Sequence, residues 1–120
     1  MNDNFQILEP IGTLNAAKGN EIRREIEYVM TSGIDIVLID LKNVQLIDSS
    51  GLGALVSTMQ FVRKSNKKLY ICSVNNQVQM LFELTKMDRI MQILKDREEF
   101  EKLEQVVKNR EELNSHVLIS

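Results

Sequence analysis

The sequence predicts a single α/β domain in which strands and helices alternate along the chain. Short aliphatic runs typical of buried strands are separated by segments in which apolar residues recur at helical spacing. Such alternation favours one sheet whose crossover connections place helices over its faces. The length of 120 residues fits one domain with one core. We expect this domain to span residues 1–110 and a tail to follow at residues 111–120.

The N-terminal part of the chain predicts a strand and then a helix. Residues 5–8 are rich in β-forming side chains, and Pro10 limits this segment to an edge strand because proline cannot donate a ladder hydrogen bond. Residues 16–32 carry apolar side chains at helical spacing, and Gly33 follows as a stop signal. The apolar face of this helix consists of Ile22, Ile26, Val29 and Met30.

The middle of the chain predicts a central strand and a second helix. Residues 34–41 form a nearly continuous aliphatic run, which is typical of a strand covered on both faces. The period changes after Asp48, where a helix begins at the serine pair and ends near Asn66. Phe61 lies outside the apolar face of this helix, so either a neighbouring helix covers it or it faces a partner. The apolar face consists of Leu52, Leu55, Val56, Met59 and Val62.

The last third of the chain predicts a strand at residues 68–74, a short helix at 78–84 and a final strand at 90–94. Asp96 and Glu99 resemble a capping box that opens a last helix. We expect the tail beyond that helix to be frayed. The predicted apolar stripe of the last helix is Phe100, Leu103 and Val106 or Val107, and the tail carries the apolar residues Val117, Leu118 and Ile119.

Composition and charge exclude several classes of function. The formal net charge is -2 and both signs are interspersed, so no basic field favours a nucleic-acid partner. No apolar run approaches the ~20 residues that span a bilayer, and no basic leader opens the sequence. We therefore expect a cytoplasmic protein without a membrane partner. Cys72 is the single cysteine and lies in an apolar run, which predicts a buried thiol in a reducing compartment.

The sequence predicts no enzyme, cofactor site or metal site. His116 is the only histidine, and no constellation of cysteine or carboxylate ligands surrounds it. A receiver domain, in which Asp40 would accept phosphate and bind magnesium, needs further carboxylates beside the acceptor, and no acidic pair ends the first strand. The nucleotide-binding motifs G-x-x-x-x-G-K-[ST] and G-x-G-x-x-G do not occur.

The most informative motif is Asp48-Ser49-Ser50-Gly51, at the predicted start of the second helix. Partner sites of α/β sheets gather at such loops, beyond the carboxyl ends of the strands. The simplest interpretation is a capped helix, because Asp and Ser accept first-turn amides. However, a single helix cap needs fewer than the three polar residues that stand here. Gly51 and Gly53 each destabilise a helix by about 1 kcal/mol relative to alanine. We expect exposed amides here, where the helix dipole favours a phosphate on Ser49 although Asp48 repels it.

A family resemblance gives this motif a specific meaning. The segment at residues 39–53, I-D-L-K-N-V-Q-L-I-D-S-S-G-L-G, resembles the signature of the STAS domain family, and in particular of bacterial anti-sigma factor antagonists. The likeness extends to the turn at residues 12–15 and to the helix at 78–82. It implies a mixed sheet of about four or five strands, flanked by about four helices.

The resemblance also implies a partner-switching function in signal transduction and transcription regulation. In that family the unphosphorylated antagonist binds an anti-sigma factor that is also an ATP-dependent serine kinase. The kinase phosphorylates the first serine after the aspartate, which is Ser49 here, and thereby releases the antagonist. A PP2C-type phosphatase then restores the serine. The alternative is a STAS interaction module that regulates a phosphatase or a signalling complex rather than a sigma factor.

The partner surface that the resemblance implies combines the Ser49 loop with the second helix. Asp48 and Ser50 would shape the loop, and Gly51 would allow the kinase to approach closely. Members of the family often carry acidic residues where Thr13 and Asn15 stand here, which leaves the identity of the partner open. The predicted contact residues are Asp48, Ser49, Ser50, Gly51, Leu52, Asn15, Thr58 and Phe61.

Overall fold

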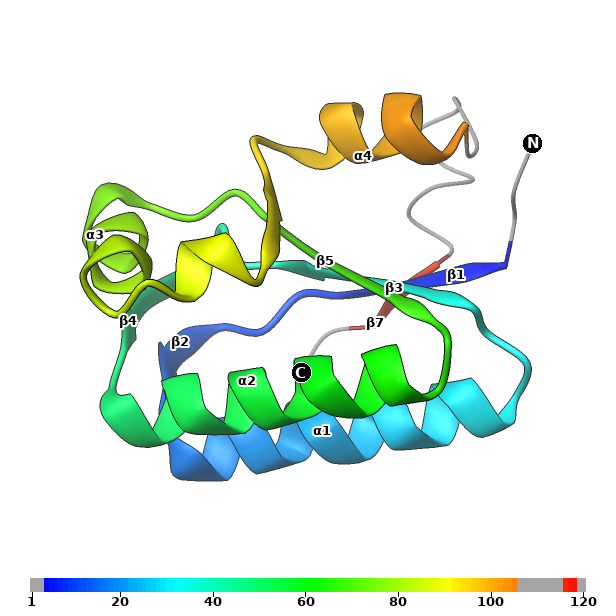
Figure 1. Cartoon of the computed structure of the whole chain (residues 1–120), viewed down its shortest axis with the longest axis horizontal. Helices are drawn as coiled ribbons and strands as arrows, with labels where there is room; N and C mark the ends of the chain where they lie inside the picture. The colour runs from blue at the N-terminus through cyan, green and yellow to red at the C-terminus, as the bar shows by residue number, and fades with distance from the viewer. Residues whose placement is uncertain (1–3, 106–115, 119–120) are drawn as a thin grey trace.

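A five-stranded sheet forms the centre of the domain in the computed structural model, which describes residues 4–105 and 116–118 (Figure 1). The strands lie in the order β6-β5-β3-β1-β7, and each of these neighbouring pairs is parallel. The predicted α/β fold is confirmed, but the sheet is parallel where the sequence predicted a mixed one. The strands are β1 (Phe5–Leu8), β3 (Ile36–Asp40), β5 (Lys68–Cys72), β6 (Gln92–Leu94) and β7 (Val117–Leu118).

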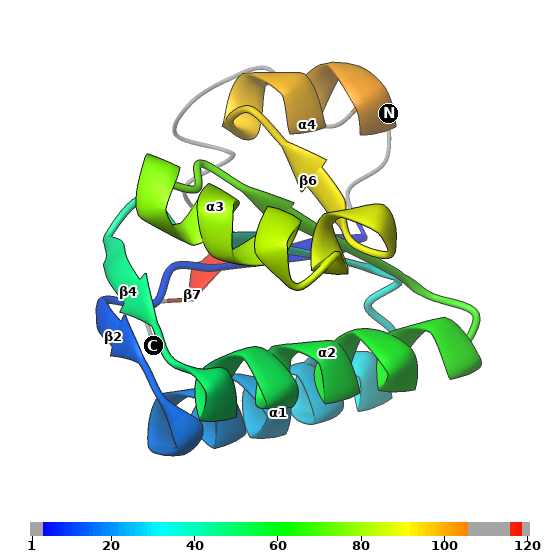
Figure 2. The same ribbon diagram turned by 60° about the vertical axis from the view of Figure 1, so that its left-hand side comes forward.

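Helices cover both faces of this sheet, as the alternating sequence pattern predicted. Helices α1 (Ala16–Thr31) and α2 (Ser49–Lys64) lie side by side on one face, and α4 (Arg97–Glu104) lies on the other (Figures 1 and 2). Helix α3 (Asn76–Leu84) and the short 3-10 helix η1 (Met87–Arg89) connect β5 to β6. The predicted helices are therefore all present.

The position of β3 explains its continuous aliphatic sequence. All of its residues are buried, because β3 lies in the middle of the sheet between two layers of helices. Val37 and Ile39 belong to the larger core beneath α1 and α2, whereas Ile36 and Leu38 belong to a second core on the face of α4. The predicted central strand is confirmed.

Helix α4 begins at the predicted cap and adds an aromatic side chain to the second core. The side chain of Asp96 accepts a hydrogen bond from the backbone amide of Glu99 at 2.9 Å. The Phe100 ring centroid lies 5.5 Å from that of Phe5 and 5.7 Å from that of Tyr70, in edge-to-face geometry. Such aromatic pairs add stability beyond the area that they bury.

The end of α4 and the C-terminal tail differ from the predictions. Leu103 is 56% exposed, so its place in a buried stripe is wrong, and residues 106 and 107 lie outside the described part. Residues 117–118 are not frayed: they form β7, and Leu118 accepts a hydrogen bond from the Glu9 amide at 2.8 Å. Strand β1 is therefore not at the edge, because β7 pairs with its otherwise open side.

An ion-pair network joins the start of α4 to the carboxyl ends of β1 and β3. Arg97 donates from Nε to Asp40 at 2.7 Å and from an Nη atom to Glu9 at 2.8 Å. Lys42 lies 3.1 Å from the Glu9 carboxylate. Asp40 is only 1% exposed, so its charge depends on the arginine for compensation.

This network predicts how stability changes with pH. Burial raises the pKa of Glu9, but the hydrogen bond from Lys42 and the charges of Arg97 and Lys42 outweigh burial and lower it below 4.5. Such a carboxylate stabilises the fold above its unfolded pKa, and the contribution disappears as the pH falls through the folded pKa. We therefore expect the urea midpoint to fall less in Glu9→Gln than in the wild type between about pH 6 and about pH 3. Parallel curves would contradict this expectation.

A second sheet of two parallel strands, β2 (Gly12–Leu14) and β4 (Val44–Ile47), lies beside the main sheet. In the pairing register, Leu14 stands opposite Ile47. The residues that follow, Asn15 and Asp48, cap α1 and α2 respectively. The two helices therefore start next to each other, at the place where this small sheet ends (Figure 2).

Candidate functional site

The candidate site is the start of α2, directly after β4. Asp48 is the N-cap, and its Oδ1 accepts a hydrogen bond from the Gly51 amide at 2.8 Å. Ser49 and Ser50 are exposed. Because Asp48 caps the helix, neither serine is needed for that purpose. The local structure therefore holds the Ser49 side chain at the surface, in the first turn of a long helix.

Two opposing electrostatic effects would act on a phosphate added to Ser49. The N-terminus of α2 carries the positive end of the helix dipole, which stabilises a negative group. Within α2, all of which the structure describes, the first turn contains no acidic side chain. The Asp48 carboxylate is the neighbouring negative charge. A phosphate is therefore compatible with the folded helix and changes mainly the charge of its surroundings.

Asn15 joins this surface through the pairing of β2 with β4. Its side chain caps α1 by accepting a hydrogen bond from the Lys18 amide at 3.0 Å. The backbone amide of Asp48 donates to the Leu14 carbonyl at 3.2 Å, so the two capped turns are fixed against each other. Asn15 is exposed, as are Thr13, Ser49 and Ser50. The structure therefore brings together four polar residues from two distant segments, which we call the Ser49 surface.

Gly51 has a different position from the one that the sequence suggested. It is buried, and a Cβ atom added to it would overlap the backbone carbonyl of Leu14. The glycine is therefore required by the close approach of α2 to β2, and it is not open to a partner. Gly53 is exposed, and an added Cβ would meet no atom within 4 Å.

The two glycines predict opposite effects of alanine. We expect Gly51→Ala to destabilise the protein by about 2 kcal/mol, because either the backbone of β2 or the start of α2 must shift. Gly53→Ala should instead stabilise it by about 0.5–1 kcal/mol through helix propensity. Urea unfolding of both variants measures the difference. Equal effects would mean that the contact with Leu14 does not restrict the site.

The second helix contributes fewer surface residues than predicted. Thr58 is fully buried, and its hydroxyl donates to the Ala54 carbonyl at 2.8 Å. Leu52 is 8% exposed and belongs to the core. Phe61 is partly buried and packs against the same core, which agrees with cover by neighbouring elements. In this conformation the predicted contacts through Thr58, Leu52 and Gly51 are wrong, because these residues form the inner face of α2.

The rival phosphate acceptor, Asp40, is enclosed. Its carboxylate is paired with Arg97 and also accepts a hydrogen bond from the Lys42 amide at 3.0 Å. In the part of the chain that the structure describes, no group of three or more potential ligand residues is arranged to hold a metal ion. Cys72 is buried, and burial together with the nearby Asp40 charge raises the pKa of its thiol to about 12. This cysteine is therefore an inert part of the second core.

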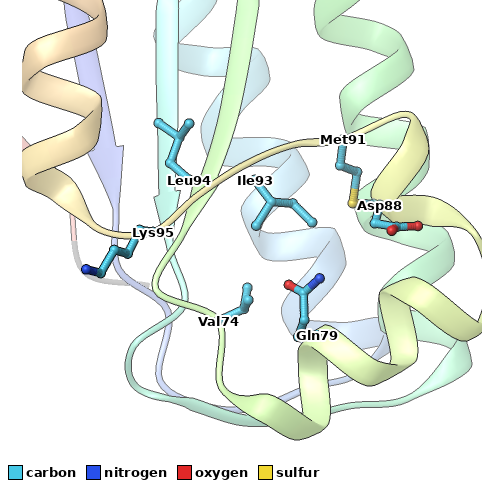
Figure 3. Close-up of a pocket in the computed structure, with 7 residues that line it drawn as sticks. All are labelled: Val74, Gln79, Asp88, Met91, Ile93, Leu94 and Lys95. Carbon is cyan, nitrogen blue, oxygen red and sulfur yellow. The ribbon is translucent and has the colours of Figure 1, made fainter.

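A pocket of about 510 Å³ lies between β6 and the segment formed by α3 and η1, and none of its lining residues belongs to the Ser49 surface. Figure 3 shows its polar side chains, Gln79, Asp88 and Lys95, among apolar ones. The Lys95 side chain points away from the other two, so the polar groups do not converge on one ligand position. The surrounding apolar residues are Val74, Met91, Ile93 and Leu94.

Comparison with protein-family models identifies the family to which this architecture belongs. The model described as the STAS domain matches residues 1–104, a range that includes helices α1 to α4 and both described sheets apart from β7. The chain belongs to the STAS domain family. The motif at residues 39–53 that suggested this family runs from β3 through β4 into the first turn of α2. The recognisable part of this STAS domain is therefore also the part that presents Ser49.

Two similar sequences are named anti-sigma-B factor antagonists. The protein of Staphylococcus aureus is 29% identical over 91 residues, which cover 76% of this chain and 84% of that protein. The protein of Staphylococcus epidermidis has the same identity and coverage. The likeness therefore extends over most of the STAS domain.

Solved structures show the same fold. A Thermotoga maritima protein assigned to the anti-sigma factor antagonists has a TM-score of 0.75 and 26% identity, with 88% of this chain and 90% of that chain covered. SpoIIAA in its unphosphorylated form has a TM-score of 0.66 and 13% identity, with coverages of 88% and 94%. The second likeness concerns the fold alone. No helix in the described part of this STAS domain is long and apolar enough to cross a membrane.

Sequence reasoning missed the β2–β4 sheet, although it identified both flanking turns. Strand β2 has only three residues and β4 has four, so neither is long enough to show a clear period. In β4 the outer residues Val44 and Ile47 are buried while the middle ones are exposed, which is not the alternation that marks an ordinary strand. The family resemblance had already grouped Asn15 with Ser49, and the structure adds the pairing of β2 with β4 that holds the two turns together.

Proposed function

We propose that this STAS domain is an anti-sigma factor antagonist in a partner-switching cycle. Unphosphorylated, it binds an anti-sigma factor that is also a serine kinase, and phosphorylation of Ser49 releases it. The observation that carries this proposal is the exposed Ser49 in the first turn of α2, whose cap is supplied by Asp48. The names of the Staphylococcus and Thermotoga relatives support it.

The chain supplies only the acceptor hydroxyl in this cycle. The kinase transfers the γ-phosphoryl group of ATP to Ser49 Oγ, ADP leaves, and a base of the kinase takes the hydroxyl proton. A PP2C-type phosphatase hydrolyses the phosphoserine, which restores the hydroxyl and releases inorganic phosphate. The chain is therefore a binding module and a substrate, and the partners perform the catalysis.

Release follows from charge rather than from refolding. Phosphorylation adds about two negative charges at pH 7, next to Asp48 on a surface of uncharged polar side chains. The positive end of the α2 dipole tolerates this group in the folded domain. In the complex, however, it would face the phosphates of the nucleotide that remains bound to the kinase. Repulsion between these groups lowers the affinity without a change of fold.

Phosphate mapping tests the proposal. Lysate of the source organism is fractionated for an ATP-dependent activity that labels the purified chain, and the active kinase is then purified. Mass spectrometry should place the phosphate on Ser49, and Ser49→Ala should abolish the labelling. Ser50→Ala is the matched control and should still be labelled.

Label on Ser50 alone, or no label in any fraction, would contradict the proposal. A chain that stays unlabelled in cells and is recovered in a stable larger assembly would instead favour the alternative, an interaction module that does not switch.

A further inference from the structure

An apolar groove of about 340 Å³ lies between β4 and α3. Three of its wall residues are far more exposed than core residues: Leu46 is 52% exposed, Met80 60% and Leu84 75%. Single exposed apolar side chains are common, whereas a cluster of them around a concave surface marks an interaction site. The lining consists entirely of uncharged residues: Leu46, Ile47, Gln77, Val78, Met80, Leu81 and Leu84.

A polar side chain holds the two walls of the groove in place. Asn75 caps α3 by accepting a hydrogen bond from the Val78 amide at 2.8 Å. Its Nδ2 donates to the carbonyls of Val44 and Gln45 in β4, at 3.3 and 3.1 Å. One residue thus fixes the start of α3 against β4. The groove is therefore a formed feature of the folded domain.

The groove is continuous with the Ser49 surface. Ile47 lines the groove, Asp48 caps α2, and Ser49 follows as the next residue. On the other strand of the small sheet, Thr13 pairs with Leu46. Figure 2 shows β4 between α3 and the start of α2. A protein that covers Ser49 therefore meets the groove at the edge of the same contact.

We propose that this groove is the apolar anchor site for the kinase that phosphorylates Ser49, and that it receives a cluster of aliphatic or aromatic side chains of that kinase. This inference rests on the proposed function. A stable interface buries roughly 800 Å² on each partner and has an apolar centre with a polar rim. The Ser49 surface is polar and small, so it suits the rim. The adjoining groove supplies the apolar surface that such an interface needs.

Affinity measurements with the purified kinase test this inference. The first variant, Met80→Gln with Leu84→Gln, changes the α3 wall, and the second, Leu46→Gln, changes the β4 wall. We expect each to weaken binding by about 30-fold or more, which is the size of an interface hot spot. The KM for phosphorylation of Ser49 should rise while kcat stays unchanged, because the acceptor hydroxyl is not altered.

Tyr28→Gln is the matched control. Tyr28 is 72% exposed and lines an apolar groove between α1 and β7. It lies thirteen residues after Asn15 on the same helix, which places it ~20 Å from the Ser49 surface. The Tyr28→Gln variant should bind the kinase with the same affinity as the wild type. Urea midpoints of all variants verify that each one is folded, since the substituted side chains are exposed.

Two results would overturn the inference while leaving the proposed function intact. One is normal labelling of Ser49 with affinities of both groove variants within twofold of the wild type. The other is a wild-type chain that sediments as a dimer and groove variants that sediment as monomers, because a second copy would then occupy the groove. Failure to find any kinase that labels Ser49 would overturn both proposals.

Discussion

Arg97→Met is expected to lower the free energy of unfolding by about 3–5 kcal/mol, because it removes the partner of a buried charge. Asp40 is 1% exposed, and its Oδ2 lies 2.7 Å from Arg97 Nε. Methionine fills part of the space but cannot compensate a carboxylate. Urea unfolding with linear extrapolation at neutral pH measures the loss.

Two further variants make this measurement specific to the buried pair. Lys42→Met removes a half-exposed lysine that pairs with Glu9, and it should change stability by at most about 1 kcal/mol, as surface ion pairs do. The double variant Asp40→Asn with Arg97→Met should recover part of the loss, because no buried charge remains without a partner. If the free energy of unfolding of Arg97→Met stayed within about 1 kcal/mol of the wild-type value, the ion pairs of Arg97 would not be what stabilises α4 against the sheet.

Ser49→Asp is expected to weaken binding to the kinase by about 100-fold, or ~3 kcal/mol, because like charges facing each other across an interface cost several kcal/mol. Ser49→Ala should bind as tightly as the unphosphorylated wild type and should resist release by ATP. Titration with the purified kinase, in the presence of nucleotide, gives both affinities.

Ser65→Asp serves as the control for charge alone. Ser65 is exposed at the other end of α2, about 24 Å from Ser49 along the helix. This variant should keep its affinity, since the added charge lies beyond the screening length of ~8 Å. If Ser49→Asp and Ser65→Asp lost the same affinity, overall charge would explain the effect and Ser49 would have no special place in the interface.

The phosphorylation site and the anchor groove divide the proposed interface by chemistry. The Ser49 surface carries the switch, since its charge can change there without a change of fold. The groove between β4 and α3 provides apolar contact that phosphorylation leaves intact. The groove residues therefore contribute affinity in the unphosphorylated chain, whereas the phosphate on Ser49 causes release. The groove variants test the first role and the Ser49 variants test the second.

The elements that could be predicted from the amino-acid sequence are those whose causes are local. The helical spacing of Leu55, Met59 and Val62, the cap at Asp48 and the continuous aliphatic run of β3 were sufficient to predict α2 and the central strand. Caps and periodicity depend on residues within a few positions of each other. The same local signals located Ser49 at a helix start, and the resemblance to the STAS family assigned it the phosphate.

Contacts between distant segments became apparent in the folded domain. The tertiary structure showed that the pairing of β2 with β4 holds Asn15 beside Ser49, and it enclosed Gly51, Leu52 and Thr58, which the sequence had assigned to a partner. It also joined Asp40 to Arg97, 57 residues away. Such contacts depend on strand order and on how closely helices approach the sheet. No periodic pattern within a single segment of the sequence specifies that strand order.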